Sequence, residues 1–168
     1  MDIHAFIDQV AGEWFSQKTV YDLAGATNAS RKCNLTVIAL AATDAAIAPL
    51  CQACGVDPAQ VDRALKFQWD TREVDPYATD PLQGESLLAL LNSETSNQGD
   101  FIRSGATPVG QYALDAEGVL TLTQTCEPLI LRDRFWFATE NLRFRTGLIE
   151  QGDKITHTSF YSEIRRLK

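Results

Sequence analysis

The amino-acid sequence predicts a mostly β protein: one antiparallel β-barrel of about eight to ten strands, with a short N-terminal helix and one further helix. Strand-like segments dominate the chain after residue 100, and turn signals such as "DAEG", "ATEN" and "EQGDK" separate them. A long antiparallel meander has edges to protect, and closure into a barrel removes them. Because 168 residues is near the usual size of one domain, we expect a single domain over residues 1–168.

The first part of the chain contains a helix pattern followed by two strand patterns. Apolar residues at Ile3, Phe6, Ile7 and Val10 have the three-and-four spacing of a short amphipathic helix over residues 2–11. Gly12 ends this helix. Residues 14–23 and 29–40 are rich in β-branched and aromatic residues, and the turn-prone "GATNAS" joins them. We therefore expect two strands here.

The middle of the chain combines one helix with two further strands. In "TDAAIAPLCQACGVDPAQV" we expect a helix that is capped by Asp44 and ends at Cys54, with Gly55 as the left-handed terminator. A strand over residues 64–73 and a loop over 74–84 follow. The segment "ESLLALLNSE" fits a short helix or a buried strand by periodicity, and its strand neighbours favour a strand. The later strands are expected within residues 99–105, 109–127, 131–139 and 141–166.

Composition and charge exclude some classes of function. Apolar residues make up 45% of the chain and charged residues 22%, a globular balance. The formal net charge of −7 argues against a general nucleic-acid binder, because the phosphates would repel the protein. The negative net charge is still compatible with an anionic small molecule as ligand. Salt screens exposed charges beyond about 8–10 Å, so distant acidic residues repel such a ligand only weakly. Arginines inside a cleft can therefore still attract it.

The sequence contains no targeting or membrane signal. The N-terminal "MDIHAFIDQV" contains acidic residues and no long apolar run, so we expect neither a signal peptide nor a plastid transit peptide. No segment approaches the ~20 apolar residues that cross a bilayer. We expect a cytoplasmic protein.

The four cysteines, Cys33, Cys51, Cys54 and Cys126, predict reduced thiols in this compartment. The "CQAC" spacing resembles half of a zinc site, but a second ligand pair with suitable spacing is missing from the sequence. We interpret Cys51 and Cys54 as small buried helix residues. No metal and no permanently bound cofactor are expected.

The segment "RDRFWFATENLRFRTGLI", residues 132–149, sets arginines among aromatic residues on two expected strands. A three-residue turn at 138–140 would place Asp133 opposite Arg145 and Phe135 opposite Arg143. A two-residue turn would instead place Trp136 opposite Arg143. The alternation alone fits arginines that face water, because arginines are seldom buried unpaired. It also fits a pocket in which guanidinium groups bind carboxylates and stack on flat rings.

An ordered set of motifs adds a resemblance over essentially the whole chain. "AGEWFSQKT", "WD" at residues 69–70, "RSGATPVGQY", "DRFWFATENLRFRT" and "SFYSEIRR" occur in this order. Together they resemble the S-type (CpcS/CpeS) phycobiliprotein lyases of cyanobacteria and red-lineage algae. The resemblance implies a lipocalin-like (calycin) barrel. It also implies that a linear tetrapyrrole, phycocyanobilin or phycoerythrobilin, is bound as substrate and joined by a thioether to a cysteine of an apo-phycobiliprotein subunit.

The same resemblance implies the site residues. Its acidic residue and arginine pair fall on Asp133, Arg143 and Arg145, which are our candidate catalytic residues. Asp133 stands where relatives usually have glutamate, and Lys18 in "SQKT" stands where they have arginine. The candidate bilin-binding residues are Lys18, Trp69, Trp136, Asn141, Arg143 and Arg145. Arginines would pair with the propionates, Trp69 would stack on the bilin, and Asp133 would bind pyrrole N–H groups.

Three functions remain open at this point. The first is a bilin lyase that acts on phycocyanin, allophycocyanin or phycoerythrin, with the β subunit as the foremost acceptor. The second is a lipocalin-like carrier of a bilin or another small molecule without transfer activity. The third is a supporting subunit of a heteromeric lyase. A homodimer or a heterodimer with a related subunit is compatible with each of them.

Overall fold

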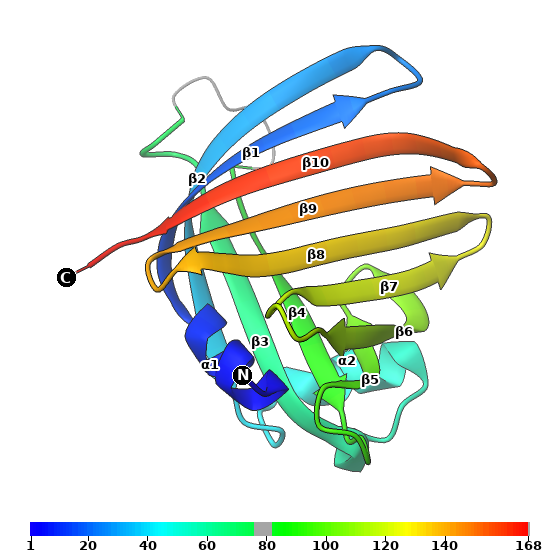
Figure 1. Cartoon of the computed structure of the whole chain (residues 1–168). Coiled ribbons are helices and arrows are strands. Elements are labelled where there is room, and N and C mark those ends of the chain that lie inside the picture. The colour runs from blue at the N-terminus through cyan, green and yellow to red at the C-terminus, as the bar shows by residue number, and fades with distance from the viewer. Residues whose placement is uncertain (76–81, 168) are drawn as a thin grey trace.

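The computed structural model describes residues 1–75 and 82–167, which form a closed antiparallel barrel of ten strands with two α-helices (Figure 1). Each strand pairs with the next along the chain, and β1 pairs with β10 to close the barrel. The elements are α1 (Ile3–Val10), β1 (Gly12–Asp22), β2 (Thr27–Leu40), α2 (Ile47–Cys54), the 3-10 helix η1 (Pro58–Gln60), β3 (Val61–Asp70), β4 (Gln83–Leu91), β5 (Gln98–Arg103), β6 (Ala106–Leu114), β7 (Leu120–Cys126), β8 (Leu129–Thr139), β9 (Leu142–Gln151) and β10 (Lys154–Arg165). The predicted barrel is confirmed.

Most predicted elements are found, with shifted ends. The ambiguous "ESLLALLNSE" is strand β4, and α2 ends at Cys54 with Gly55 at a φ of 68°. Asp44 does not cap α2 as predicted, because the helix begins at Ile47. The Asp44 side chain instead accepts a hydrogen bond from the Ala46 amide in the preceding turn. Part of the predicted loop, residues 76–81, lies outside the described residues.

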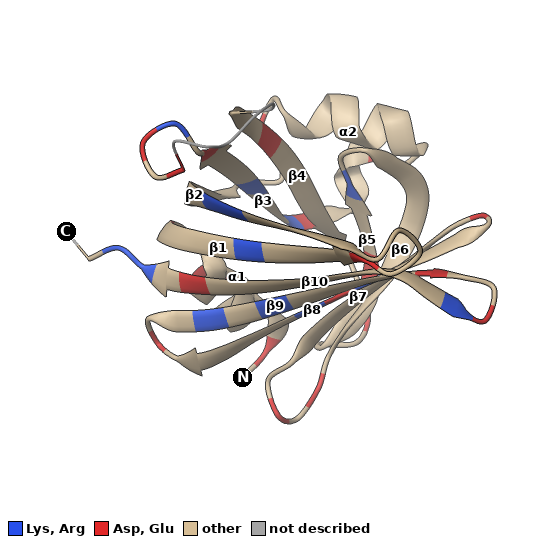
Figure 2. Cartoon of the chain, turned by 90° about the horizontal axis from the view of Figure 1, so that it is seen from above, with Lys and Arg blue, Asp and Glu red and all other residues tan. Residues whose placement is uncertain are grey.

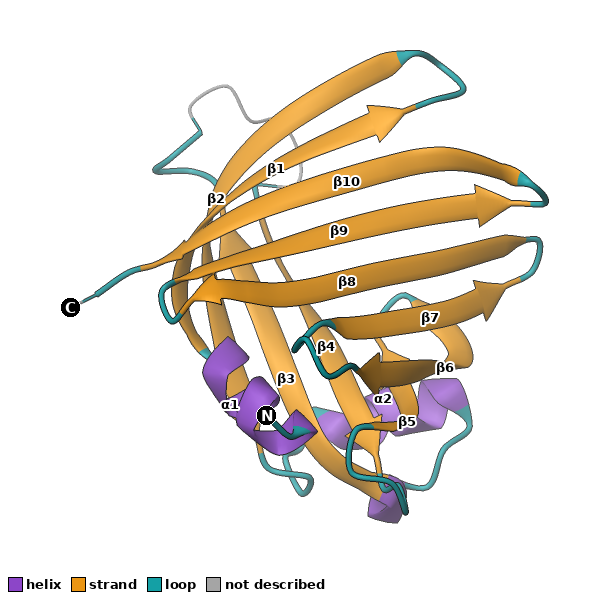
Figure 3. Ribbon diagram, in the orientation of Figure 1, coloured by secondary structure: helices purple, strands orange, loops and turns teal. Residues whose placement is uncertain are grey.

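Helix α1 lies across one end of the barrel (Figure 3). Its apolar face, Ile3, Phe6, Ile7 and Val10, is buried in the same core cluster as Trp14 of β1. The Phe6 ring meets Phe137 of β8 edge-on, with 5.4 Å between ring centroids. The helical spacing in the sequence thus produces an apolar plug at this end.

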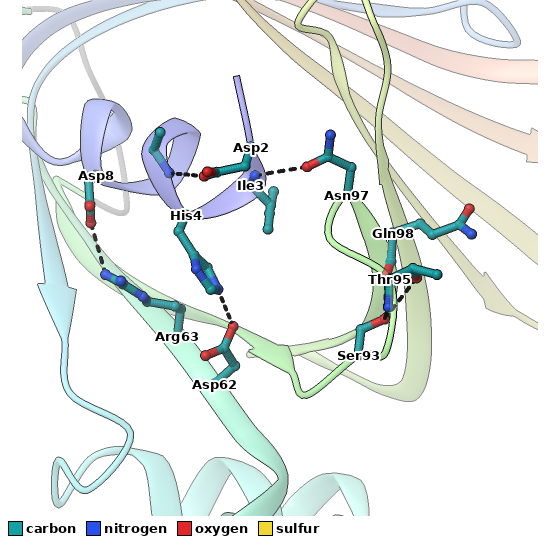
Figure 4. Close-up of polar contacts among 11 residues, drawn as sticks. Asp2, Ile3, His4, Asp8, Asp62, Arg63, Ser93, Thr95, Asn97 and Gln98 are labelled. Carbon is teal, nitrogen blue, oxygen red and sulfur yellow. Dashed lines mark hydrogen bonds and ion pairs between the residues drawn. The ribbon is translucent and has the colours of Figure 1, made fainter.

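Polar contacts fasten the outer side of α1 (Figure 4). Asp2 caps the helix by accepting from the Ala5 amide at 2.8 Å. His4 Nε2 lies 2.6 Å from Asp62 Oδ2, and Arg63 donates to Asp8 at 3.0 Å. These contacts tie α1 to β3 and fix the plug in place.

Helix α2 packs outside the barrel and forms a second apolar cluster. Ile47, Leu50 and Cys51 are buried there against residues of β3, β4 and β5. Cys51 is fully buried, as predicted, whereas Cys54 is only half-buried. Within residues 1–75 and 82–167, no helix is long and apolar enough to span a membrane.

Candidate functional site

A cavity of about 660 Å³ lies in the part of the barrel away from the α1 plug. Its floor consists of core residues, including Leu35, Phe67, Leu88, Leu122 and Phe135. The cavity reaches solvent at the opposite end, where the lining residues Arg31, Ser104 and Gly105 are exposed. The volume is within the roughly 300–1,000 Å³ of typical small-molecule sites.

The charged residues that line the cavity, among those described, are mostly basic. They are Lys18, Arg31, Arg103 and Arg145, with Asp133 as the acid. Several acidic residues instead lie in the exposed hairpin turns, for example Asp115, Glu127 and Asp153 (Figure 2). The protein as a whole carries −7, yet its cavity is cationic. A cavity of this kind favours an anionic ligand.

Four of the predicted site residues line this cavity: Lys18, Trp69, Asp133 and Arg145. They come from β1, β3, β8 and β9, so the barrel brings together residues that are far apart in the sequence. Lys18 Nζ lies 5.1 Å from the centroid of the Tyr161 ring, and Arg145 Cζ lies 3.9 Å from it. Tyr161, which the sequence analysis did not select, therefore connects the two cations.

Arg143 faces inward as predicted but lies in the floor below the cavity. Its side chain is 1% exposed, its Nε pairs with Glu163, and its Nη1 donates to the Val10 carbonyl at 2.8 Å. Burial lowers the pKa of Arg143 to about 10, although the charge of Glu163 opposes this. The structure gives Arg143 a structural contact, because its guanidinium holds the end of α1. Its predicted contact with a ligand stays a prediction.

Trp14 completes this floor. Its ring is sandwiched between Arg143 Cζ at 4.0 Å and Arg165 Cζ at 4.2 Å, and its Nε1 donates to the Val10 carbonyl. Arg165 donates to the Ala11 and Gln9 carbonyls. The carbonyls at the C-terminal end of a helix have no hydrogen-bond donors within the helix, and side chains of the barrel supply these donors for α1.

Trp136 and Asn141 do not line the cavity. Trp136 alternates with the inward-facing Phe135 and Phe137, so it points to the outer face of β8 and packs against Phe144 with 5.8 Å between centroids. Asn141 belongs to the β8–β9 turn, where its carbonyl accepts from the Arg165 amide. The cavity therefore does not bring these two residues together with the other predicted site residues.

Neither expected register of the β8–β9 hairpin is formed. The turn has two residues, and a bulge between Phe137 and Thr139 shifts the pairing. Phe137 then lies opposite Arg143, Phe135 opposite Arg145, and Asp133 opposite Gly147. The cross-strand pair of Asp133 with Arg145 is absent. Asp133 pairs with Arg103 of β5, and Arg145 pairs with Glu163 of β10.

Glu163 is the main residue that the sequence analysis missed. It is 0% exposed, and its carboxylate contacts Arg143, Arg145 Nη2 at 3.0 Å and Ser16 Oγ at 3.0 Å. Burial opposes its ionisation, but the charges of Arg145 and Arg143 outweigh burial and hold the pKa of Glu163 below its ordinary value. Its alternation with Tyr161 on β10 was the signal that could have placed it inside.

Arg145 sits between this buried carboxylate and the cavity. Burial lowers the pKa of an arginine, but Glu163 reverses the direction and raises the pKa of Arg145. Its Nε is buried without a hydrogen-bond partner in the described part of the chain. Arg145 therefore lines the cavity as an ionised guanidinium that the buried carboxylate of Glu163 holds in place.

Comparisons with known proteins agree with this fold. The model of the CpeS-like protein family matches residues 2–166. The protein called chromophore lyase CpcS/CpeS of Thermosynechococcus vestitus is 34% identical over 98% of this chain and 93% of its own length. Chromophore lyase CpcS/CpeS 1 of Trichodesmium erythraeum is 32% identical over 100% of this chain and 99% of its own.

A solved structure supports the lipocalin-like fold. The S-type phycobiliprotein lyase CPES of Guillardia theta superposes with a TM-score of 0.83, at 21% identity, over 100% of this chain and 94% of its own. At that identity the likeness concerns the fold alone, whereas the family model and the two relatives concern descent. The chain belongs to the CpeS-like family, the family of the CpcS/CpeS chromophore lyases.

Proposed function

We propose that this protein is a chromophore lyase that binds phycocyanobilin or phycoerythrobilin in the barrel cavity and attaches it to a phycobiliprotein cysteine. The foremost acceptor is the β subunit. One observation carries the proposal: an acidic protein encloses a cationic cavity with aromatic walls. A bilin has two propionates and a flat conjugated system, which match these two properties. The family membership of the chain supports the same function.

The cavity residues have separate tasks in binding. Arg145, Lys18 and Arg31 are available to pair with the propionates at one wall, which β9, β10, β1 and β2 form. Trp69 of β3 offers an indole face to the conjugated rings. Asp133 on β8 offers carboxylate oxygens to pyrrole N–H groups. A flexible bilin held at three places is restricted to few conformations.

The attachment step is an addition with nothing leaving. The acceptor thiolate attacks the ethylidene carbon of ring A, a C–S bond forms there, and a proton is taken up at the neighbouring ring carbon. The sulfur and the hydrogen of the thiol add to the two carbons of the double bond, so the step needs no oxidant or reductant. This protein contributes orientation of the bilin and protection of its other positions, which is the entropic part of catalysis.

Cys33 lines the same cavity, and its protonation state favours transfer to another protein. Burial raises the pKa of the Cys33 thiol, and the nearby charges of Arg145 and Lys18 do not offset this. Since the thiolate is the nucleophile, Cys33 is a poor competitor for the bilin. Its free state, shared with Cys51, Cys54 and Cys126, also supports action in a reducing cytosol or stroma.

Absorption spectroscopy tests binding and transfer in turn. We expect the spectrum of phycocyanobilin or phycoerythrobilin to change when the protein is added. With an apo β subunit present, a covalent band that fluoresces with zinc after denaturation is expected. Binding without this band indicates a carrier. A band that requires a second lyase subunit indicates a supporting subunit, and no spectral change with either bilin contradicts the proposal.

A pair of lysines on neighbouring strands tests the cationic wall. Lys18 lines the cavity, whereas Lys32 of β2 lies opposite Gln17 and faces outward. We expect Lys18→Gln to raise the bilin Kd about fivefold, as for a partly solvated ion pair of about 1 kcal/mol. Lys32→Gln serves as the control and should leave the Kd unchanged. Equal Kd values for both variants and the wild type would show that Lys18 does not bind a propionate.

A further inference from the structure

Arg103 and Asp133 form an ion pair across the cavity wall. Arg103 Nη1 donates to Asp133 Oδ2 at 2.6 Å, although β5 and β8 are separated by two strands in the barrel. Both residues line the cavity, and their side chains are 22% and 32% exposed. The carboxylate expected to meet the ligand is thus already held by a cation.

Gln124 of β7 fixes the position of this arginine. It is 1% exposed, and its Oε1 accepts from Arg103 Nε at 2.6 Å. Its Nε2 donates to the Ala106 and Pro108 carbonyls. Because those carbonyls accept only, the amide orientation is set, and its oxygen must point to Arg103. The guanidinium is therefore held at two atoms.

The second oxygen of Asp133 lies close to a glycine of the neighbouring strand. Asp133 lies opposite Gly147 of β9. A Cβ at Gly147 would lie 3.1 Å from Asp133 Oδ1 and 2.5 Å from Ser159 Oγ. The absence of a side chain at Gly147 makes room for Asp133 Oδ1 and Ser159 Oγ, while Oδ2 is bound to Arg103.

We propose that Arg103, anchored by Gln124, is a positioning residue that fixes Asp133 as the carboxylate acceptor for ligand N–H groups. This inference rests on the proposed function, because the N–H groups are those of a bilin. Each bidentate face of the guanidinium, Nε/Nη2 and Nη1/Nη2, already has one donor in use. Arg103 is consequently unsuited to grip a propionate with its fork.

Phycocyanobilin and its dimethyl ester distinguish the two roles of an arginine, since the ester has no carboxylates. We expect Arg103→Gln and Asp133→Asn each to raise the Kd about tenfold for both ligands, as for the loss of a hydrogen bond to a charged group. The double variant should bind no worse than either single variant, because both remove one unit. The long-wavelength band of the bound ligand should shift in the same direction in both single variants.

A loss in Arg103→Gln that disappears with the ester would mean direct propionate binding and would overturn the proposal. Arg132→Gln is the matched control, because Arg132 pairs with Glu150 at 3.5 Å on the outer face of the same strand as Asp133. Arg103→Lys replaces Arg103→Gln if the latter does not fold by circular dichroism. Wild-type protein that binds neither ligand contradicts the proposed function itself. Wild-type binding with unchanged Arg103 variants contradicts the positioning role alone.

Discussion

Replacing Glu163 by glutamine is expected to lower the free energy of unfolding by about 3–5 kcal/mol. The wild-type carboxylate is 0% exposed, and its single negative charge contacts two guanidinium groups, those of Arg143 and Arg145. Glutamine keeps the size and one acceptor oxygen but removes the negative charge that both cations contact. Burial of an unpaired charge is costly because water no longer solvates it. Urea unfolding followed by circular dichroism measures the difference.

An outer ion pair provides the control for this variant. Glu150 of β9 contacts Arg132 of β8 at 3.5 Å, and the arginine side chain is 42% exposed. Since water screens this pair, Glu150→Gln should cost at most about 1 kcal/mol. Equal losses in the two variants would mean that the Glu163 cluster contributes no more than a surface pair.

The lowered pKa of Glu163 also gives the effect a pH dependence. A carboxyl whose pKa is lower in the folded than in the unfolded state stabilises the fold above its unfolded pKa, about 4.3. This contribution falls as the pH decreases through the folded pKa. The wild type should therefore lose stability in acid relative to Glu163→Gln, and the two unfolding free energies should converge.

Gly84→Ala is expected to weaken bilin binding about tenfold or more and to cost about 1–3 kcal/mol of stability. Gly84 of β4 lies opposite Trp69 of β3, and an added Cβ would be 2.3 Å from the indole Cζ2. The indole has to leave its position, and Trp69 lines the cavity. Bilin titration and tryptophan fluorescence report the two consequences.

A second substitution separates two effects of Gly84→Ala, the steric clash with the Trp69 indole and the loss of stacking between that indole and the bilin. Trp69→Phe in the Gly84→Ala background removes the atoms that clash, so stability should return while binding stays weak. Gln83→Ala, at the neighbouring exposed position, should change neither. Unchanged bilin affinity in Gly84→Ala would show that the position of the indole does not matter for the ligand.

Alternation along single strands was predictable from the sequence, whereas contacts between distant strands were not. The α1 face of Ile3, Phe6, Ile7 and Val10 follows from local periodicity. For Arg145 the alternation placed it on one face with Arg143 but did not say which face is inside, and the family resemblance pointed inward. The β8–β9 register depends on one bulge residue, which the periodicity does not reveal. This bulge moved Asp133 away from Arg145.

The acidic partners of the site arginines could not be predicted from the sequence either. Glu163 lies 20 residues from Arg143, and Arg103 lies 30 residues from Asp133. Glu163 lies directly opposite Arg143 on β10, so that pair depends on the register of the β9–β10 hairpin. Arg103 and Asp133 lie on β5 and β8, which β6 and β7 separate, so their meeting depends on the curvature of the barrel. Trp136 shows the converse: its place in a family-like motif suggested the cavity, but the parity of β8 turns it outward.

The plug formed by α1 has a consequence for the order in which a bilin is taken up and released. Phe6, Ile7 and Trp14 fill one end of the barrel, so a bilin enters and leaves through the other end. The bilin ring that enters last is therefore also the bilin ring that leaves first. In the proposed reaction, ring A then has to follow the rest of the chromophore inward to be the part that an acceptor thiol meets at the rim. The direction of loading, more than the reactivity of the individual rings, would decide which bond is made.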